Sequence, residues 1–409
     1  MKRIRGAMIL CCLGGALGCL AQDARSLAMG GITILNDFNH VIYNPSSLND
    51  FPDQFMGTAG TYHDTLYAGP VVAKKSFGRV LNLGVIANTT GTQGSSVLRG
   101  NFYPQARSFL LVETGDTLPA AFPMIPHGLL GLNFGDFGLG VDAYYETVYY
   151  GRTGPGDGQY SHAGIDNTGL CFSANIYLGD FWLCPLLGFG KPVIRGERKD
   201  SALTTVSSKK GDFFTAGTEA GIELSKAMYV AGVYYTNERS QFSSTRVLSP
   251  DYATVIFDIY AGYTIQLPES TLLAIQYDLT LQNDDSNDTN KVAPLTYQST
   301  YAYHAFHLGV EKTFTTTGMF DAVIPRAGLL YAVEKSTETT NAETEWFPLF
   351  PYAVQLNSGI GLKKDIFDLD LFFNIGTWSG LISGPRSLAA TLTVRLPKKK
   401  EATDDSSYH

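Results

Sequence analysis

The chain has 409 residues, of which 17% are charged and 12% aromatic, with 43 glycines and a formal net charge of −8. An acidic chain without clusters of Lys and Arg is a poor candidate for nucleic-acid binding. After residue 21 no run of 18 apolar residues occurs, which excludes a membrane-spanning helix and leaves a membrane β-barrel open.

Residues 1–21 have the pattern of an export signal. Lys2, Arg3 and Arg5 form a basic start, and the apolar run GAMILCCLGGALGCLA follows them. We expect cleavage after Ala21. Lipoprotein cleavage before Cys19 is the alternative, although ALGC lacks the usual Leu three residues ahead of the cysteine. Removal of the signal leaves 27 Lys and Arg against 38 Asp and Glu, a net charge of −11.

Residues 22–52 are expected to form a compact apolar segment ahead of the strands. The stretch DARSLAMGGITILNDFNHVIYNPSSLND is too rich in small residues for a first strand and too short and broken for a spanning helix. Asn44 can cap a helix whose first residue is Pro45. Gly30 and Gly31 permit tight packing or a positive φ. An ordinary N-terminal strand and turn is the alternative interpretation.

Alternation of apolar and polar residues dominates the rest of the chain. In SLAATLTVRL (387–396) and TLLAIQYDLTL (271–281), one face of each strand is apolar and the other mostly polar. Counting from residue 79 predicts 14 strands. Residues 54–63 and 65–75 either join the wall, giving 16 strands, or fold inward. The predicted strands are 79–90, 127–134, 138–150, 168–178, 181–190, 213–224, 227–237, 253–265, 270–281, 302–314, 322–335, 354–363, 366–377 and 387–396.

The lengths of the strands and of their connections favour a membrane barrel over a soluble sandwich. Strands of 10 to 14 residues are long for a sandwich but suit a tilted membrane strand. Tight turns such as GDFG (135–138) and LGDF (178–181) alternate with long polar stretches. We therefore predict an all-β, antiparallel transmembrane barrel of the bacterial outer membrane over 53–396, with a charged periplasmic tail at 397–409. The long stretches lie near 91–126, 151–167, 191–212, 238–251, 282–301 and 336–353.

The sequence ARSLAMGG followed by YNPSSL resembles the N-terminal signature of the FadL-like outer-membrane barrel superfamily. Ala28 stands where the family has its first glycine. The resemblance implies that the N-terminal segment folds into the lumen as a hatch. The matching residues are Ala24, Arg25, Met29, Gly30, Gly31, Asn44, Pro45, Ser46 and Leu48.

The signature begins soon after the predicted cleavage site, which is similar to the PorV/PorQ branch of that superfamily. That branch implies a non-enzymatic role in protein export or surface attachment, of the type IX secretion kind, with exported proteins or secretion components as partners. A FadL-like channel for fatty acids or other hydrophobic small molecules is the first alternative. A structural barrel without cargo is the second.

If the apolar strand faces contact lipid, the charged residues of the other faces line the lumen. An excess of acids there is best interpreted as hydrated networks that support the barrel, since unpaired carboxylates would repel a bound carboxylate. The acids are Asp142, Glu146, Glu219, Glu223, Asp258, Asp278, Glu311, Glu334, Asp368 and Asp370, and the bases are Arg79, Arg326, Lys363 and Arg395.

No catalytic or metal site and no cofactor is predicted. Asp258 and Asp278 share a facing on neighbouring strands, opposite or one pair apart, and are expected to be a solvated pair. The acidic loop 283–290 lacks the Gly and Glu of a calcium loop. His304 and His307 lie on opposite faces of one strand. Cys171 and Cys184 share the lumen face but lie too far apart along their strands for a disulfide.

Overall fold

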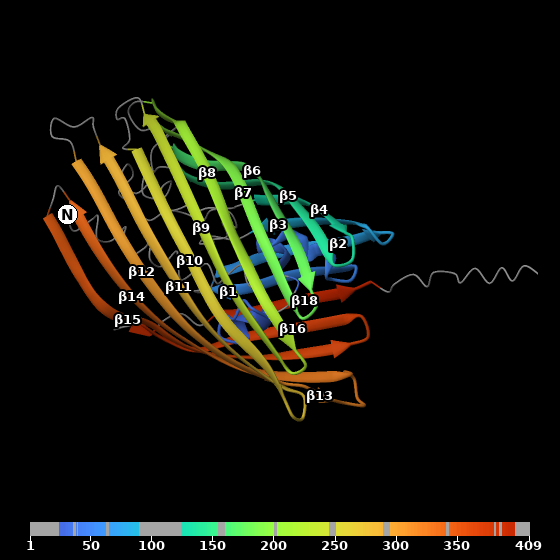
Figure 1. Cartoon of the computed structure of the whole chain (residues 1–409). Coiled ribbons are helices and arrows are strands. Elements are labelled where there is room, and N and C mark those ends of the chain that lie inside the picture. Colours follow the sequence, from blue (N-terminus) through green and yellow to red (C-terminus); the bar gives the residue numbers. More distant parts are fainter. Residues whose placement is uncertain are drawn as a thin grey trace, which may run out of the picture.

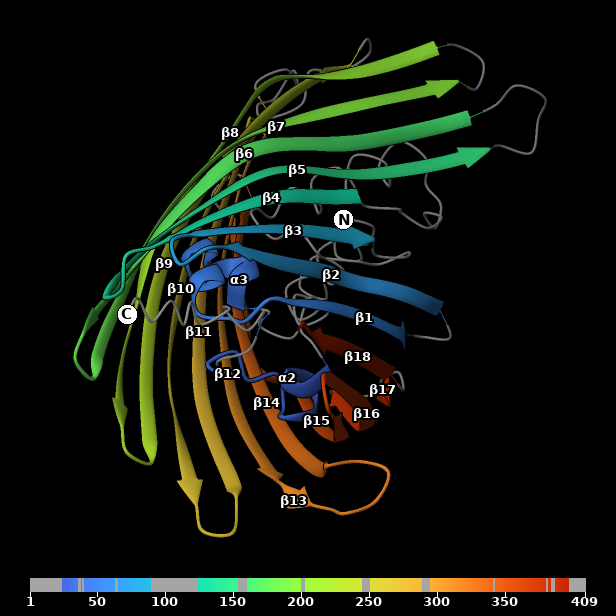
Figure 2. The same ribbon diagram turned by 90° about the vertical axis from the view of Figure 1, so that its right-hand side faces the viewer.

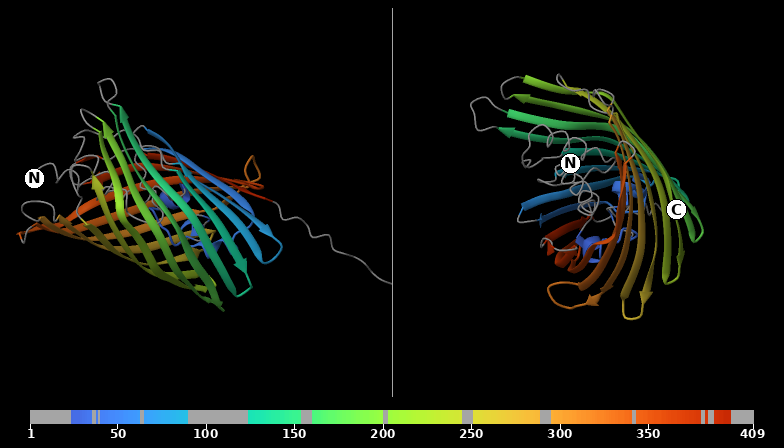
Figure 3. Two further views of the ribbon diagram at one scale, coloured as in Figure 1. Left: turned by 90° about the horizontal axis from the view of Figure 1, so that it is seen from above. Right: turned by 90° about the vertical axis from the view of Figure 1, so that its left-hand side faces the viewer.

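The computed structural model is a closed, antiparallel β-barrel (Figures 1 and 3). It describes residues 24–35, 38, 40–62, 65–89, 124–153, 160–199, 203–244, 251–288, 295–340, 343–379, 382–383 and 387–396. The predicted signal at 1–21, most of the stretch 91–126 and the tail 397–409 lie outside the described residues. No described helix is long and apolar enough to span a membrane, an observation that does not bear on β-barrels.

The wall consists of sixteen strands of nine or more residues in the described part of the chain. They are β1 (Gln54–Tyr62), β2 (Thr65–Phe77), β3 (Leu81–Thr89), β4 (Met124–Asn133), β5 (Phe137–Thr153), β6 (Tyr160–Leu178), β7 (Phe181–Lys199), β8 (Leu203–Leu224), β9 (Ala227–Ser244), β10 (Asp251–Leu267), β11 (Thr271–Asp288), β12 (Leu295–Lys312), β14 (Ala322–Thr340), β15 (Glu343–Lys364), β16 (Phe367–Ser379) and β18 (Ser387–Arg395). The two-residue strands β13 (Phe314–Thr315) and β17 (Ile382–Ser383) pair with β14 and β16.

Each long strand pairs with its sequence neighbours, and β1 pairs with β18 to close the wall. β1 and β2 therefore belong to the wall, so the predicted alternative of 16 strands is confirmed and the count of 14 is wrong. Residues 54–63 and 65–75 are hard to recognise as wall strands from sequence, because their glycines and alanines weaken the alternation of apolar and polar residues.

The predicted strand ends at the tight turns are confirmed to within a few residues, whereas most of the opposite ends fall short of the observed ones. β8 begins at Leu203, ten residues before the predicted start, and β15 at Glu343 instead of 354. The acidic stretch 283–288 is the end of β11 and not a loop. Backbone pairing continues where the strands leave the apolar region, whereas the apolar alternation that predicted them stops there.

The outer side of the wall is apolar. In β6, Leu170 is 45% exposed and Phe172 41%, whereas the intervening Cys171 is fully buried. A row of rings runs across β7–β10, with centroids 5.4 Å apart for Phe189 and Phe214. The row continues through Tyr235 and Phe257, whose centroids are 5.1 Å apart. Exposed apolar side chains bordered by an aromatic girdle are the surface that contacts lipid in outer-membrane barrels.

The N-terminal segment (residues 24–50) lies inside the barrel. It contains α2 (Ala24–Ala28), α3 (His40–Tyr43) and the 3₁₀ helix η2 (Pro45–Asn49), which appear in blue within the ring of strands (Figure 2). η2 contacts β3 to β6, whereas α2 contacts β14, β15, β16 and β18. The segment thus contacts two separate parts of the wall near the end that carries the tight turns.

Candidate functional site: the N-terminal segment and its contacts with the wall

α2 is attached to the wall by a charged cluster. Arg25 donates to Glu311 through Nη2 at 2.7 Å and Nε at 3.1 Å. Arg326 donates from Nε to the same carboxylate at 2.9 Å and from Nη1 to Asp370 at 2.6 Å. Arg25 and Arg326 therefore share one carboxylate, and paired Arg–carboxylate contacts of this kind are the stronger hydrogen bonds in proteins. The Ala24 N–H donates to the Thr391 hydroxyl at 2.9 Å.

Gly30 and Gly31 are required where the chain leaves α2. Both have positive φ, +86° and +85°, which disfavours any side chain. A Cβ on Gly30 would overlap the backbone of Leu329, and one on the wall residue Gly328 would overlap Gly30. Backbone thus packs directly on backbone. The His307 ring places Nδ1 2.7 Å from the Gly30 carbonyl and Nε2 2.8 Å from Asp278 Oδ2.

The middle of the segment is held by Gln276 of β11. Its side-chain carbonyl accepts from the N–H groups of Thr33 at 2.8 Å and Ile34 at 3.2 Å. Its amide donates to the Thr33 hydroxyl at 2.8 Å. One buried wall side chain therefore takes the place of a strand partner for an extended stretch of the segment.

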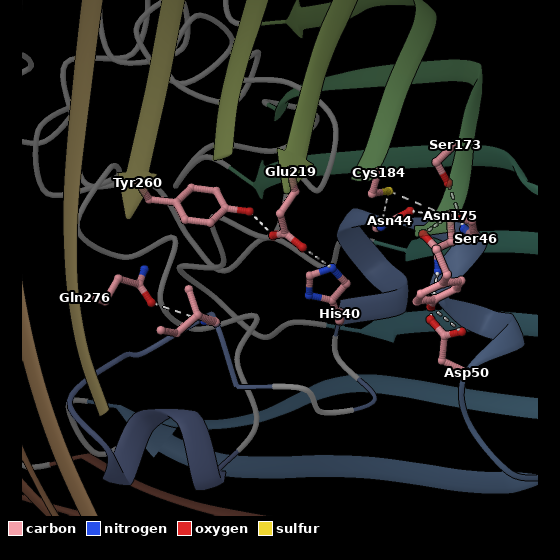
Figure 4. Close-up of polar contacts among 12 residues, drawn as sticks. His40, Asn44, Ser46, Asp50, Ser173, Asn175, Cys184, Glu219, Tyr260 and Gln276 are labelled. Atoms are coloured by element: carbon pink, nitrogen blue, oxygen red, sulfur yellow. Dashed lines mark hydrogen bonds and ion pairs between the residues drawn. The ribbon is translucent and has the colours of Figure 1, made fainter. Parts of the chain in front are cut away.

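The NPSS sequence is held by a polar network over β6 and β7 (Figure 4). The Ser46 N–H donates to the Ser173 hydroxyl at 2.7 Å, and the Ser46 hydroxyl lies 2.7 Å from Asn175 Oδ1 and 2.8 Å from Asn44 Oδ1. The Asn44 amide donates to Cys184 Sγ. η2 begins at Pro45 as predicted, but it is a 3₁₀ helix and Asn44 makes no capping bond, because its side chain is bound to the wall.

The end of η2 adds a carboxylate to this network. Asp50 accepts from the Tyr177 hydroxyl and from the Asn175 amide, each at 2.8 Å. Burial raises the pKa of Asp50 above its usual value, opposed by the Tyr177 hydrogen bond. Between η2 and α2, His40 Nε2 lies 3.2 Å from Glu219 Oε1, and the Tyr260 hydroxyl donates to Oε2 of the same carboxylate (Figure 4).

Two apolar clusters complete the contact between the segment and the wall. Phe38, Val41 and Leu48 pack on β1 to β4 with Met56, Val72, Ile86 and Leu129. Met29, Ile32, Ile34 and Leu35 pack on Val230 and Ala274 of β9 and β11, where four partly buried wall side chains adjoin them. These four are Trp182, Met228, Tyr260 and Leu272.

The structure places most of the predicted signature residues at this contact. Ala24, Met29, Pro45, Ser46 and Leu48 are buried, and Arg25, Gly30 and Asn44 make the contacts described above. Wall residues that sequence reasoning missed are Ser173, Asn175, Gln276 and the inward glycines, of which Gly140 lies against Ser46. A glycine on the polar face of a predicted strand is the sequence signal that indicates such a close contact.

The predicted lumen charges divide into paired and separate groups. Glu311, Arg326 and Asp370 form the cluster at α2, Asp368 binds Arg395, and Asp142 lies 2.8 Å from His127. Arg79 and Glu223 are exposed near the tight turns. The assignment of Arg79 to the lumen is wrong, because Arg79 lies in a turn between two strands. The side chain of Glu146 lies outside the described residues.

The structure also places the other residues that the sequence analysis singled out. Asp258 is one pair from Asp278 and accepts from the Thr280 hydroxyl at 2.6 Å. His304 bonds to Tyr277 on the outer side, whereas His307 faces inward. Cys171 and Cys184 are buried free thiols. Within the described residues, no group of three or more His, Cys, Asp or Glu could hold a metal ion.

A closed barrel with an apolar outer surface, and with its own N-terminal segment inside the lumen, has the architecture of an outer-membrane protein. The chain is a bacterial outer-membrane β-barrel. No protein-family model and no curated protein matches it.

Among solved structures the chain is similar to the toluene transporter TbuX of Ralstonia pickettii, with 12% identity over 92% of this chain and 98% of that one and a TM-score of 0.43. It is similar to the toluene transporter TodX of Pseudomonas putida, with 11% identity over 91% and 97% and a TM-score of 0.42. The alcaligin receptor FauA of Bordetella pertussis also gives 11% identity and a TM-score of 0.42, over 85% and 66%. The two toluene transporters and the alcaligin receptor thus have nearly equal TM-scores with this chain.

Proposed function

We propose that the chain is an outer-membrane channel for small hydrophobic molecules, in which the N-terminal segment acts as a hatch. The observation that carries the proposal is the apolar strip on the inner wall beside Met29–Leu35. Trp182, Met228, Tyr260 and Leu272 point inward from β7, β9, β10 and β11 and are only partly buried. Apart from the fully buried apolar cluster on β1 to β4, the described inner wall is rich in charged and polar side chains.

The strip supports passage of an apolar solute past the hatch. Met228 and Leu272 lie next to the tight turns, so the strip extends from the hatch toward the periplasmic rim. The hatch contacts it through aliphatic side chains and is held beside it by the Gln276 hydrogen bonds, without the ion pairs that fix α2. An apolar molecule can replace such contacts at little cost, whereas a polar molecule would lose hydration there.

The test is uptake of N-phenylnaphthylamine, a hydrophobic fluorescent probe, by cells that express the barrel. We expect faster uptake than in cells without it. Met228→Glu places a charge on the strip and should lower the barrel-dependent rate about tenfold, the effect of roughly 1.4 kcal/mol.

Met228→Leu is the matched control, because it conserves volume and polarity and should leave the rate unchanged. Equal uptake with and without the barrel would contradict the proposal. So would equal rates for wild type and Met228→Glu, or an equal gain for a charged dye, which would indicate a general leak.

The export role implied by the PorV/PorQ resemblance is a second candidate. The observation that favours it is the length of β5 to β12, β14 and β15, which have 17 to 22 residues. A membrane strand needs only about 9–11 residues, so these strands project outward and offer a surface to a protein. Recovery of exported proteins or secretion components with the barrel from outer membranes supports this role, and recovery of the barrel alone contradicts it.

A further inference from the structure

A shallow, widely open groove of about 590 Å³ lies in the wall between β4 and β6. Its lining residues are His127, Gly128, Ala143, Tyr144, Tyr145, Thr168, Gly169 and Leu170. Gly128, Ala143, Tyr145, Thr168 and Leu170 occupy exposed, lipid-facing positions. The groove therefore opens to the membrane and not to the lumen, and it does not belong to the contact between the N-terminal segment and the wall.

Sequence explains why the wall is hollowed here. Gly128 has no side chain and Ala143 only a methyl group, so the lipid-facing surface drops between the larger Tyr145 and Leu170. The pairing of β4 with β5 skips Ile125 and Pro126 next to this point. Proline cannot donate to a neighbouring strand, and such a residue interrupts a ladder.

The floor of the groove is rigid. The Tyr144 ring stacks on His127, with centroids 5.5 Å apart and an interplanar angle of 25°. The Tyr144 hydroxyl donates to the Phe189 carbonyl at 3.2 Å, and His127 Nδ1 lies 2.8 Å from Asp142 Oδ2. These rings lie on the inner side of the sheet, and their contacts among β4, β5 and β7 brace the backbone that forms the floor of the groove.

The outer rim of the groove is polar and carries a cation. Thr168 lies directly opposite Lys191 of β7, and both are exposed. The Tyr145 hydroxyl donates to Asp166 Oδ1 at 2.8 Å at the same edge. Below this rim, Leu170 lies opposite Phe189, the first ring of the aromatic girdle. Lys191 therefore stands two residues beyond the girdle, where the headgroups of the outer leaflet begin.

We propose that this groove binds lipopolysaccharide, the phosphorylated and acylated glycolipid of the outer leaflet. One acyl chain fills the apolar groove over Gly128 and Ala143, and a phosphate contacts the Lys191 ammonium. Along the wall the apolar groove is followed by the Lys191 cation, and along the lipid the acyl chains are followed by the anionic phosphates, so the two match. Asp166 opposes the phosphate, and its hydrogen bond from Tyr145 lessens that repulsion without removing it.

The experiment measures lipid A retained by the purified full chain in non-ionic detergent, by native mass spectrometry. Lys191→Glu removes the cation, and Gly128→Leu fills the groove. A Cβ on Gly128 would have its nearest neighbour 3.9 Å away, so the fold accommodates this change. Each variant is expected to lower retention about tenfold, the loss of one charge-assisted contact or of the acyl site. Asp166→Asn is expected to raise retention.

The matched controls are Arg239→Glu and Ala231→Leu, at exposed positions of β9 outside the groove. They should retain lipid A like the wild type. Equal losses in the groove and control variants overturn the proposal, as does wild-type protein that retains no lipid A. A change from monomer to dimer in Gly128→Leu with unchanged lipid A would assign the groove to a second copy instead. Uptake of the hydrophobic probe should not change in Gly128→Leu, so failure here and failure of the channel proposal are distinguishable.

Discussion

Arg25 is the residue that attaches α2 to the wall, through two hydrogen bonds to Glu311. Arg25→Ala removes both, while Arg326 still binds the carboxylate and prevents an unpaired buried charge. We expect local opening of α2 to become easier by about 2 kcal/mol, the value of charge-assisted hydrogen bonds. Hydrogen exchange of the amides of residues 24–31 measures this opening.

Arg25→Lys is the control for charge alone. Lysine keeps the charge but cannot form the forked contact, so its exchange rates should lie between those of wild type and Arg25→Ala. Unchanged exchange in the alanine variant would show that the apolar contacts of Leu27 and Ala28 hold α2 without the ion pair.

Asp321 lies in the turn before β14, outside the membrane-spanning part of the strands. The Asp365 N–H and Lys364 bind its carboxylate and hold the pKa of Asp321 below its ordinary value of 3.8. A lowered pKa stabilises the fold above the ordinary value, and this contribution disappears as the pH falls through the folded pKa. Wild type should therefore melt above Asp321→Asn at neutral pH and together with it in strong acid. A difference that persists in acid would contradict this origin.

At the scale of elements, η2 depends on the close approach of its backbone to β5. A Cβ on Gly140 would overlap the backbone of Ser46. Gly140→Ala should therefore displace η2 at a cost of about 1–3 kcal/mol, as in overpacked cores. Cys184, which Asn44 contacts, reports the displacement: its thiol should react faster with a maleimide. Gly128→Ala, on the same sheet with open space around its Cβ, should leave the rate unchanged.

The elements also show what the sequence allows one to predict. Strands were recognisable where the bilayer imposes alternation, as at Leu388–Leu396, and turns where Gly135 and Gly179 adopt positive φ. The outer halves of β8 and β15 were missed because polar surroundings impose no pattern on paired backbone. The signature of the N-terminal segment was visible, but its partners Ser173 and Gln276 were not, since contacts between residues more than 100 positions apart leave no local periodicity.

For the whole molecule, the pattern of turns predicts which end faces outward. Gln298→Cys lies near the outer end of β12, and Gly318→Cys lies in a tight turn. An impermeant maleimide should label the first on intact cells and the second only after the outer membrane is permeabilised. Cys171 and Cys184 are buried and should contribute little background. Labelling of position 318 on intact cells would reverse the orientation.

Closure of the wall by β1 and β18 constrains how the molecule is assembled. β18 is the last of the described strands, yet its partner β1 begins only four residues after Asp50. The cylinder therefore stays open along this line until β18 pairs with β1. The nine register pairs between β1 and β18 are the contacts that close the wall directly after the N-terminal segment. The N-terminal segment contacts both flanks of this line, β3 to β6 on one side and β14, β15, β16 and β18 on the other, so it also joins the two ends of the sheet.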